Sequence, residues 1–94
     1  MNIKLSKAAI LENCAEECAE LNHACLKMAR KIRGENPTPK TIEEIKENLI
    51  EELADVALTM SAVISALDLN MSEIENLVGY KTTRWKHRLE KAGK

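Results

Sequence analysis

The sequence predicts an all-α protein in which an antiparallel helical hairpin and a third helix assemble into an oligomeric helix bundle. Apolar residues recur at alternating spacings of three and four, the period of an amphipathic helix, and no segment alternates as a half-buried strand does. Helix start and stop signals divide the chain into three stretches. A length of 94 residues predicts one domain over 1–94, and so short a chain buries only about 60% of its unfolded surface.

The first helix is expected over about residues 7–33. Its apolar stripe consists of Leu11, Cys14, Cys18, Leu21, Cys25, Met28 and Ile32. Such spacing, sustained over several turns, is typical of a long amphipathic helix. Gly34 then ends the helix, and two prolines keep the segment 34–39 in a turn.

The second helix is expected to begin after Thr41, which forms a capping-box pattern with Glu44, and to run to about residue 67. Its apolar stripe consists of Ile42, Ile45, Leu49, Leu53, Val56, Met60, Val63 and Leu67. Because the connection is short, the first two helices should be antiparallel neighbours. Ser72 with Glu75 forms a second capping-box pattern and predicts a third helix over about 73–91, with Trp85 on its core side.

Composition excludes several classes of protein. The formal net charge of -1 gives no basic excess for nucleic acid. No stretch approaches the roughly 18 apolar residues of a membrane span, and the N-terminus lacks the apolar core of a signal peptide, so we expect a cytoplasmic protein that does not bind membranes. The three cysteines all lie on the apolar stripe of one helix without a CxxC pattern, which predicts reduced core residues.

Two pairs of acids are the most informative feature of the chain. Glu17 and Glu20 lie on the first helix, and Glu52 and Asp55 lie on the second. At a spacing of three, both members of a pair project from one helix face. Each acid also directly precedes an apolar stripe residue. With equal offsets in an antiparallel hairpin, both pairs should lie on the same flank of the seam, Glu17 and Glu52 at g positions and the other two at c.

Four carboxylates on one flank repel each other unless a cation lies between them, so the sequence predicts a metal site. Carboxylate oxygens without a histidine suit Mg²⁺, or Mn²⁺, rather than zinc or copper. A di-iron centre would need two Glu-x-x-His motifs. The chain has Glu20 with His23, but Arg84 stands three residues before His87, which excludes that centre. Glu16 is a neighbouring acid that either assists the site or is an ordinary solvated glutamate.

The segments Glu-Glu-Cys-Ala-Glu-Leu (16–21) and Glu-Glu-Leu-Ala-Asp-Val (51–56) closely resemble the paired EExxE and ExxD motifs of the MazG-like nucleotide pyrophosphohydrolases. The resemblance covers about residues 10–91. One departure is the spacer over residues 21–51, which is longer than is common in that family. The resemblance implies an all-α domain that forms a homodimer or a homotetramer. Second apolar faces, such as Ile50 with Ile64, also predict self-association.

The same resemblance implies that Glu17, Glu20, Glu52 and Asp55 bind Mg²⁺. It implies cleavage of a nucleoside triphosphate between its α and β phosphates, in the housekeeping of non-standard nucleotides, with Glu17 or Glu16 as the candidate general base. The basic stripe of the third helix, Lys81, Arg84 and Arg88, is the candidate phosphate-binding set. Its alternative is a solvated basic face favoured by the helix dipole, which also accounts for the basic residues that end the first helix. No residue identifies the base of the nucleotide.

Two other interpretations remain open. The first is a non-catalytic helical dimerisation or regulatory module, in which the acids form only a charged flank. The second is a phosphoribosyl-ATP pyrophosphohydrolase, which would have the right size. The second motif of that enzyme usually continues with Tyr-His after the aspartate, whereas here Val56 and Ala57 follow. Dependence on a divalent metal separates an enzyme from the module.

Overall fold

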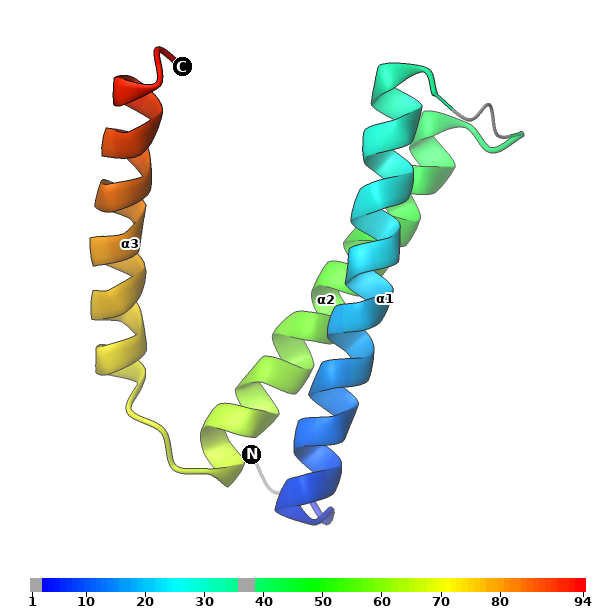
Figure 1. The fold of residues 1–94 in the computed structure, drawn as a ribbon. Helices are drawn as coiled ribbons and strands as arrows, with labels where there is room; N and C mark the ends of the chain where they lie inside the picture. Colours follow the sequence, from blue (N-terminus) through cyan, green and yellow to red (C-terminus); the bar gives the residue numbers. More distant parts are fainter. Residues whose placement is uncertain (1–2, 36–38) are drawn as a thin grey trace.

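The computed structural model describes residues 3–35 and 39–94, and they form three helices. These are α1 (Lys7–Arg33), α2 (Ile42–Ala66) and α3 (Met71–Lys91). Helices α1 and α2 form an antiparallel hairpin, and α3 rises beside it without closing onto it (Figure 1). The predicted all-α class is confirmed for the described ranges. Part of the predicted turn, residues 36–38, lies outside them.

The ends of the hairpin helices are held by local hydrogen bonds. Gly34 adopts a left-handed φ of 74° and its N–H donates to the Lys31 carbonyl, which ends α1 as predicted. At the start of α2, the Glu44 N–H donates to the Thr41 hydroxyl at 3.2 Å and the Thr41 N–H donates to the Glu44 carboxylate at 2.9 Å. The predicted capping box is therefore confirmed.

Helix α3 begins two residues earlier than predicted. Asn70, not Ser72, is its N-cap: the Asn70 Oδ1 accepts a hydrogen bond from the Glu73 N–H at 3.2 Å. Just before it, α2 ends in a left-handed Asp68 (φ 51°), whose N–H donates to Ser65, and Leu69 N–H donates to Ile64. The stop of α2 and the cap of α3 are thus almost adjacent, which leaves no room for a start at Ser72.

The packed seam of the hairpin shares part of each predicted stripe: Cys14, Leu21 and Met28 on α1, and Ile45, Leu49, Val56 and Val63 on α2, are buried or half-buried as predicted. The buried and half-buried rows are 10, 14, 17, 21, 24, 28 and 31 on α1, and 45, 49, 52, 56, 59, 63 and 66 on α2. Leu53 and Met60, predicted in the core, are 50% and 48% exposed, and Cys18 and Cys25 are exposed as well. Each helix has two adjacent apolar lines. The other seam positions are taken by residues next to the predicted ones, among them Glu17, Glu52 and Thr59.

Helix α3 has no buried residue. Trp85, predicted on the core side, is 63% exposed, so that expectation is wrong for the single chain. Within residues 3–35 and 39–94, only α1 and α2 share an extended interface. The radius of gyration is 16.9 Å, whereas a compact chain of this length would have about 12 Å. Among the described residues, no helix is long and apolar enough to cross a bilayer.

Candidate metal centre

Four carboxylates lie close together near the middle of the α1–α2 hairpin. They form the acid cluster: Glu17, Glu20, Glu52 and Asp55. One carboxylate oxygen from each lies within 4.8 Å of the others. The spacing of three within each pair and the antiparallel packing of the helices produce this convergence. The prediction that both acid pairs lie on one flank of the hairpin is confirmed by this geometry.

The depth of the cluster differs from the prediction. Glu17 and Glu52 are members of the seam rows and are half-buried, whereas Glu20 and Asp55 are exposed at the rim. The expected g positions for Glu17 and Glu52 are therefore wrong, because the seam is rotated toward the acids. The Oε2 atoms of Glu17 and Glu52 are buried without a hydrogen-bond partner. A buried polar atom with no partner lowers the stability of the fold.

The electrostatics of the cluster favour a cation. Burial raises the pKa of Glu17, and the charges of Glu20 and Asp55 raise it further. Burial likewise raises the pKa of Glu52, and the same two neighbours add to the effect. All the charges that shift these two pKa values belong to carboxylates. A bound cation would reverse this effect, since an opposite charge favours the ionised carboxylate.

The donor set is compatible with one small hard cation. All four side chains offer oxygen, the ligand atom that Mg²⁺ and Mn²⁺ prefer. Opposite ligands of Mg²⁺ stand about 4.2 Å apart, since each lies about 2.1 Å from the ion. The 4.8 Å span of the cluster would need only a small contraction to reach that value.

Thr59 is a buried polar residue of this region that sequence reasoning missed. Its hydroxyl donates to the Asp55 and Val56 carbonyls, both at 3.1 Å. Both acceptors are backbone carbonyls of α2 itself, about one turn before Thr59. The buried hydroxyl therefore has its hydrogen-bond partners within its own helix. The signal that would have found it is its place seven residues after Glu52, one heptad along the same row.

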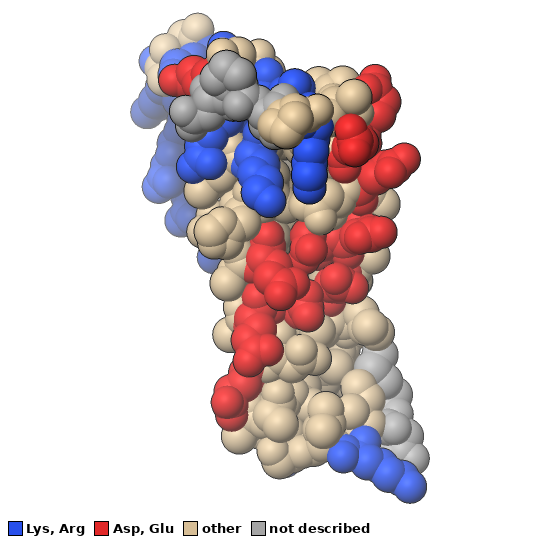
Figure 2. Space-filling model, turned by 90° about the vertical axis from the view of Figure 1, so that its right-hand side faces the viewer, with Lys and Arg blue, Asp and Glu red and all other residues tan. Residues whose placement is uncertain are grey.

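Basic side chains border the acids on one face of the hairpin. Figure 2 views the side turned away from α3, where acidic side chains form a band across the middle and basic side chains lie above it, toward the turn end. Lys27 and Lys31 follow Glu20 by seven and eleven residues, which places them on the same flank of α1. The sequence had indicated only a dipole role for them. Their place on the same flank of α1 as Glu20 does not follow from that dipole role.

The predicted phosphate-binding residues do not join the acid cluster within one chain. Lys81, Arg84 and Arg88 are exposed on α3, which does not pack on the hairpin. Arg84 instead lies over the Tyr80 ring, 5.6 Å from its centroid. Glu16, the other predicted base, is exposed on α1 beside Glu17.

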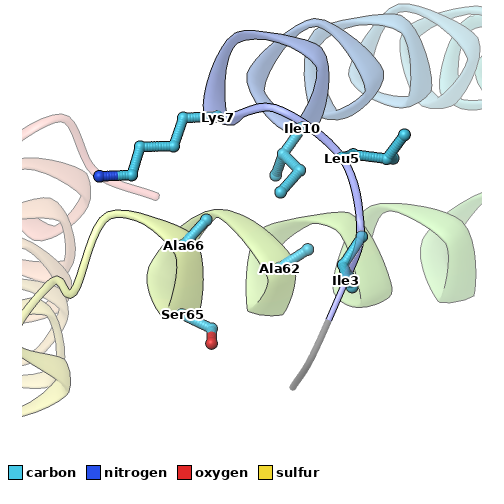
Figure 3. A pocket seen from close by; sticks show the side chains of 7 residues that line it. All are labelled: Ile3, Leu5, Lys7, Ile10, Ala62, Ser65 and Ala66. Atoms are coloured by element: carbon cyan, nitrogen blue, oxygen red, sulfur yellow. The ribbon is translucent and has the colours of Figure 1, made fainter.

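A shallow hollow lies on the same flank, at the end of the hairpin opposite the turn (Figure 3). It is lined by Ile3, Leu5, Lys7, Ile10, Ala62, Ser65 and Ala66. Ala62 and Ala66 follow Asp55 by seven and eleven residues, so they continue the acid flank of α2. With a rise of 1.5 Å per residue, Ile10 lies about 10 Å along α1 from Glu17. The flank thus carries an apolar hollow, the acid cluster and two lysines in that order.

The acid cluster has an arrangement that could hold a metal ion, with two lysines on one side of it along the flank and an apolar hollow on the other. These properties follow from the positions of the side chains on two packed helices. No protein-family model, curated protein or solved structure matches this chain.

Proposed function

We propose that the chain is a Mg²⁺-dependent nucleoside triphosphate pyrophosphohydrolase that releases a nucleoside monophosphate and pyrophosphate. The observation that carries this proposal is the pair of buried, unpartnered Oε2 atoms of Glu17 and Glu52 facing two more acids across the seam. Each of these atoms lowers the stability of the metal-free fold, and a bound cation would offset that loss. The resemblance of the two motifs to the MazG-like family supplies the reaction class.

In this proposal the acid cluster holds Mg²⁺, or Mn²⁺ in its place. The ion would neutralise charge on the phosphates and lower the pKa of a bound water. Glu17 and Glu52 fix the site from within the seam, and Glu20 and Asp55 close it from the rim. Glu17 or Glu16 accepts the proton of the attacking water. We expect the protein to act in the cytoplasm on nucleoside triphosphates. We expect it to do so as a homodimer or a homotetramer.

Two sets of basic residues are candidates for the phosphate contacts. The α3 set of Lys81, Arg84 and Arg88 is supported by the family resemblance. Lys27 and Lys31 are supported by position, since they share a flank with the acid cluster. The hollow at the other end of the flank would then receive the nucleoside, and the apolar Ile10 and Ala62 would contact its base.

The test is release of pyrophosphate from a panel of canonical and modified ribo- and deoxyribonucleoside triphosphates. We expect release with Mg²⁺, none with EDTA, and none from the Glu52→Gln variant. Glu47→Gln is the matched control, because Glu47 is exposed on the same helix outside the cluster. Release that persists in EDTA, or that is equal in both variants, would show that the acid cluster is not the catalytic site.

The non-catalytic module is the second candidate, favoured by the exposed apolar residues of α2 and α3. It predicts that folded protein cleaves no member of the panel. Thermal stabilisation by Mg²⁺ without cleavage would indicate a metal-binding module. No response to Mg²⁺ would indicate that the acids are only a charged flank.

A further inference from the structure

The three cysteines of α1 lie outside the acid cluster and have no role in the proposed reaction. All three are free thiols: Cys14 is half-buried at the seam, and Cys18 and Cys25 are exposed. The core role that the sequence predicts for them therefore fits Cys14 alone. An exposed thiol is available to a ligand. What these thiols can bind depends on the spacing between them.

Cys14 and Cys18 form a thiol pair on one side of α1. They are four residues apart on a helix, so their side chains are neighbours with about 5–6 Å between the Cβ atoms. The two thiols are close enough to hydrogen-bond to each other. Partial loss of solvent raises the pKa of the Cys18 thiol, and Cys14 raises it further. Cys18 is therefore protonated at neutral pH when nothing is bound.

The geometry of the thiol pair disfavours a disulfide and suits an ion between the sulfurs. A disulfide brings its Cβ atoms to about 3.5–4.5 Å, which is shorter than the separation on an undistorted helix. An ion that binds both sulfurs makes a longer link. Two bonds of about 2.3 Å, the length of a zinc–thiolate bond, span up to about 4.6 Å between the sulfurs. The pair can therefore hold an ion without unwinding α1.

The thiol pair offers two ligands and no third. Cys25 lies seven residues, or about 10 Å, along the helix axis from Cys18. Glu20 lies two residues after Cys18 and projects from nearly the opposite side of α1. Within residues 3–35 and 39–94, the acid cluster is the one group of three or more ligating side chains that could hold a metal ion. Two ligands are too few for zinc, which takes three or four from the protein. Of the soft metals that thiolates select, Cu⁺ remains.

We propose that Cys14 and Cys18 bind one Cu⁺ ion between their two sulfurs. Each thiol releases its proton to solvent as its sulfur binds. One Cu⁺ and two thiols thus give a copper dithiolate and two protons, with no change of oxidation state. Neighbouring turns of α1 then carry thiolates for a soft cation and carboxylates for a hard one. The thiol site uses no residue of the acid cluster, so it would stand if the chain hydrolysed nothing.

The first experiment titrates the reduced full chain with Cu⁺ in the absence of oxygen, in competition with a coloured Cu⁺ chelator. We expect one Cu⁺ per chain. Cys14→Ser and Cys18→Ser should each weaken binding by about 100-fold or more, because the second bond of a chelate forms as an intramolecular step. Cys25→Ser is the matched control and should bind Cu⁺ as the unmodified chain does. No binding, or equal weakening in all three variants, overturns the proposal.

The second experiment counts the sulfur neighbours of the bound ion by X-ray absorption on the Cu⁺-loaded chain. We expect two sulfur neighbours. Three or more would mean that Cys25 or a second copy of the chain supplies a ligand, and would overturn the proposal. Glu52→Gln should bind Cu⁺ unchanged, and a loss there would place the ion in the acid cluster and overturn it as well. If Cys14→Ser does not fold, Cys18→Ser decides, because Cys18 is exposed.

Discussion

At the scale of single residues, Glu17 and Glu52 differ from the other acids of the hairpin because each has one carboxylate oxygen buried without a partner. That they meet Glu20 and Asp55 could be predicted, since matched i, i+3 pairs on antiparallel helices converge. Their depth could not, because it depends on which of two apolar lines the helices pack along. A rotation of the seam by one row separates a solvated carboxylate from a half-buried one.

These two glutamates predict how the stability of the metal-free protein varies with pH. Burial and neighbouring acids raise both folded pKa values above the ordinary 4.5. Protonation therefore stabilises the fold, a contribution that is complete below pH 4.5 and is lost as pH rises through the folded pKa values. In EDTA, these two groups should make the free energy of unfolding by urea larger near pH 4.5 than at pH 7. The double variant Glu17→Gln, Glu52→Gln should lack this contribution, and an equal change of stability with pH in both proteins would contradict it.

Magnesium should stabilise the same site at neutral pH. A ligand that binds only the folded state adds about 2.7 kcal/mol at a concentration of 100 times its Kd. The melting temperature should therefore rise with Mg²⁺ in the unmodified chain and in Glu47→Gln. It should not rise in Glu52→Gln, whose metal-free form should be as stable as the parent or more so, because the amide relieves repulsion. Equal stabilisation of all three proteins would place the metal elsewhere.

At the scale of the helices, start and stop signals predicted most boundaries because they act through local hydrogen bonds. Gly34 and the Thr41 cap are both where the sequence placed them. The error at α3 arose because Asn70 and Ser72 both fit an N-cap, and the end of α2 selects between them. The register of the seam was mispredicted in part, because apolar character alone does not select which residues lie inside. Leu53 is more apolar than Glu52, yet Glu52 is the residue inside.

The capping box of α2 predicts a loss of stability on mutation of Thr41 that does not involve the acid cluster. Thr41→Ala removes the hydroxyl that accepts from the Glu44 N–H, and should cost about 1 kcal/mol in urea unfolding. The bonds to Thr41 also lower the pKa of Glu44. This contribution is present above pH 4.5 and is lost as pH falls through the lower folded value. Thr83→Ala, on an exposed face of α3, serves as the control, and an equal loss there would argue against the cap.

At the scale of the whole molecule, the arrangement of the helices decides which cations can reach the acid cluster. The sequence points to Lys81 and Arg84, but α3 stands on the far side of the hairpin from the acid band. Lys27 and Lys31 share the flank of the acids. Loss of a hydrogen bond to a charged phosphate costs about 1.5–3 kcal/mol, or roughly 10- to 150-fold in binding.

Steady-state kinetics on lysine variants tests this arrangement if the proposed hydrolysis holds. Lys27→Ala and Lys31→Ala should each raise the KM for the triphosphate at least several-fold. Lys86→Ala, an exposed change on α3, should leave KM unchanged. A large effect of Lys81→Ala or Arg84→Ala, with none at Lys27, would show that α3 reaches the acid cluster, from a second copy or by movement.

The sequence by itself determined the helices, their antiparallel pairing and the meeting of four acids, because helical period, capping and a short turn act over a few residues. Only the tertiary structure decided that Glu17 and Glu52 lie in the seam, that Val78 and Trp85 are exposed, and that the α3 cations stand apart from the acids. Those outcomes depend on the competition between two apolar lines on each helix and on the angle at Asp68. The first depends on packing between distant segments, and the second on the hydrogen bonds of the turn between α2 and α3.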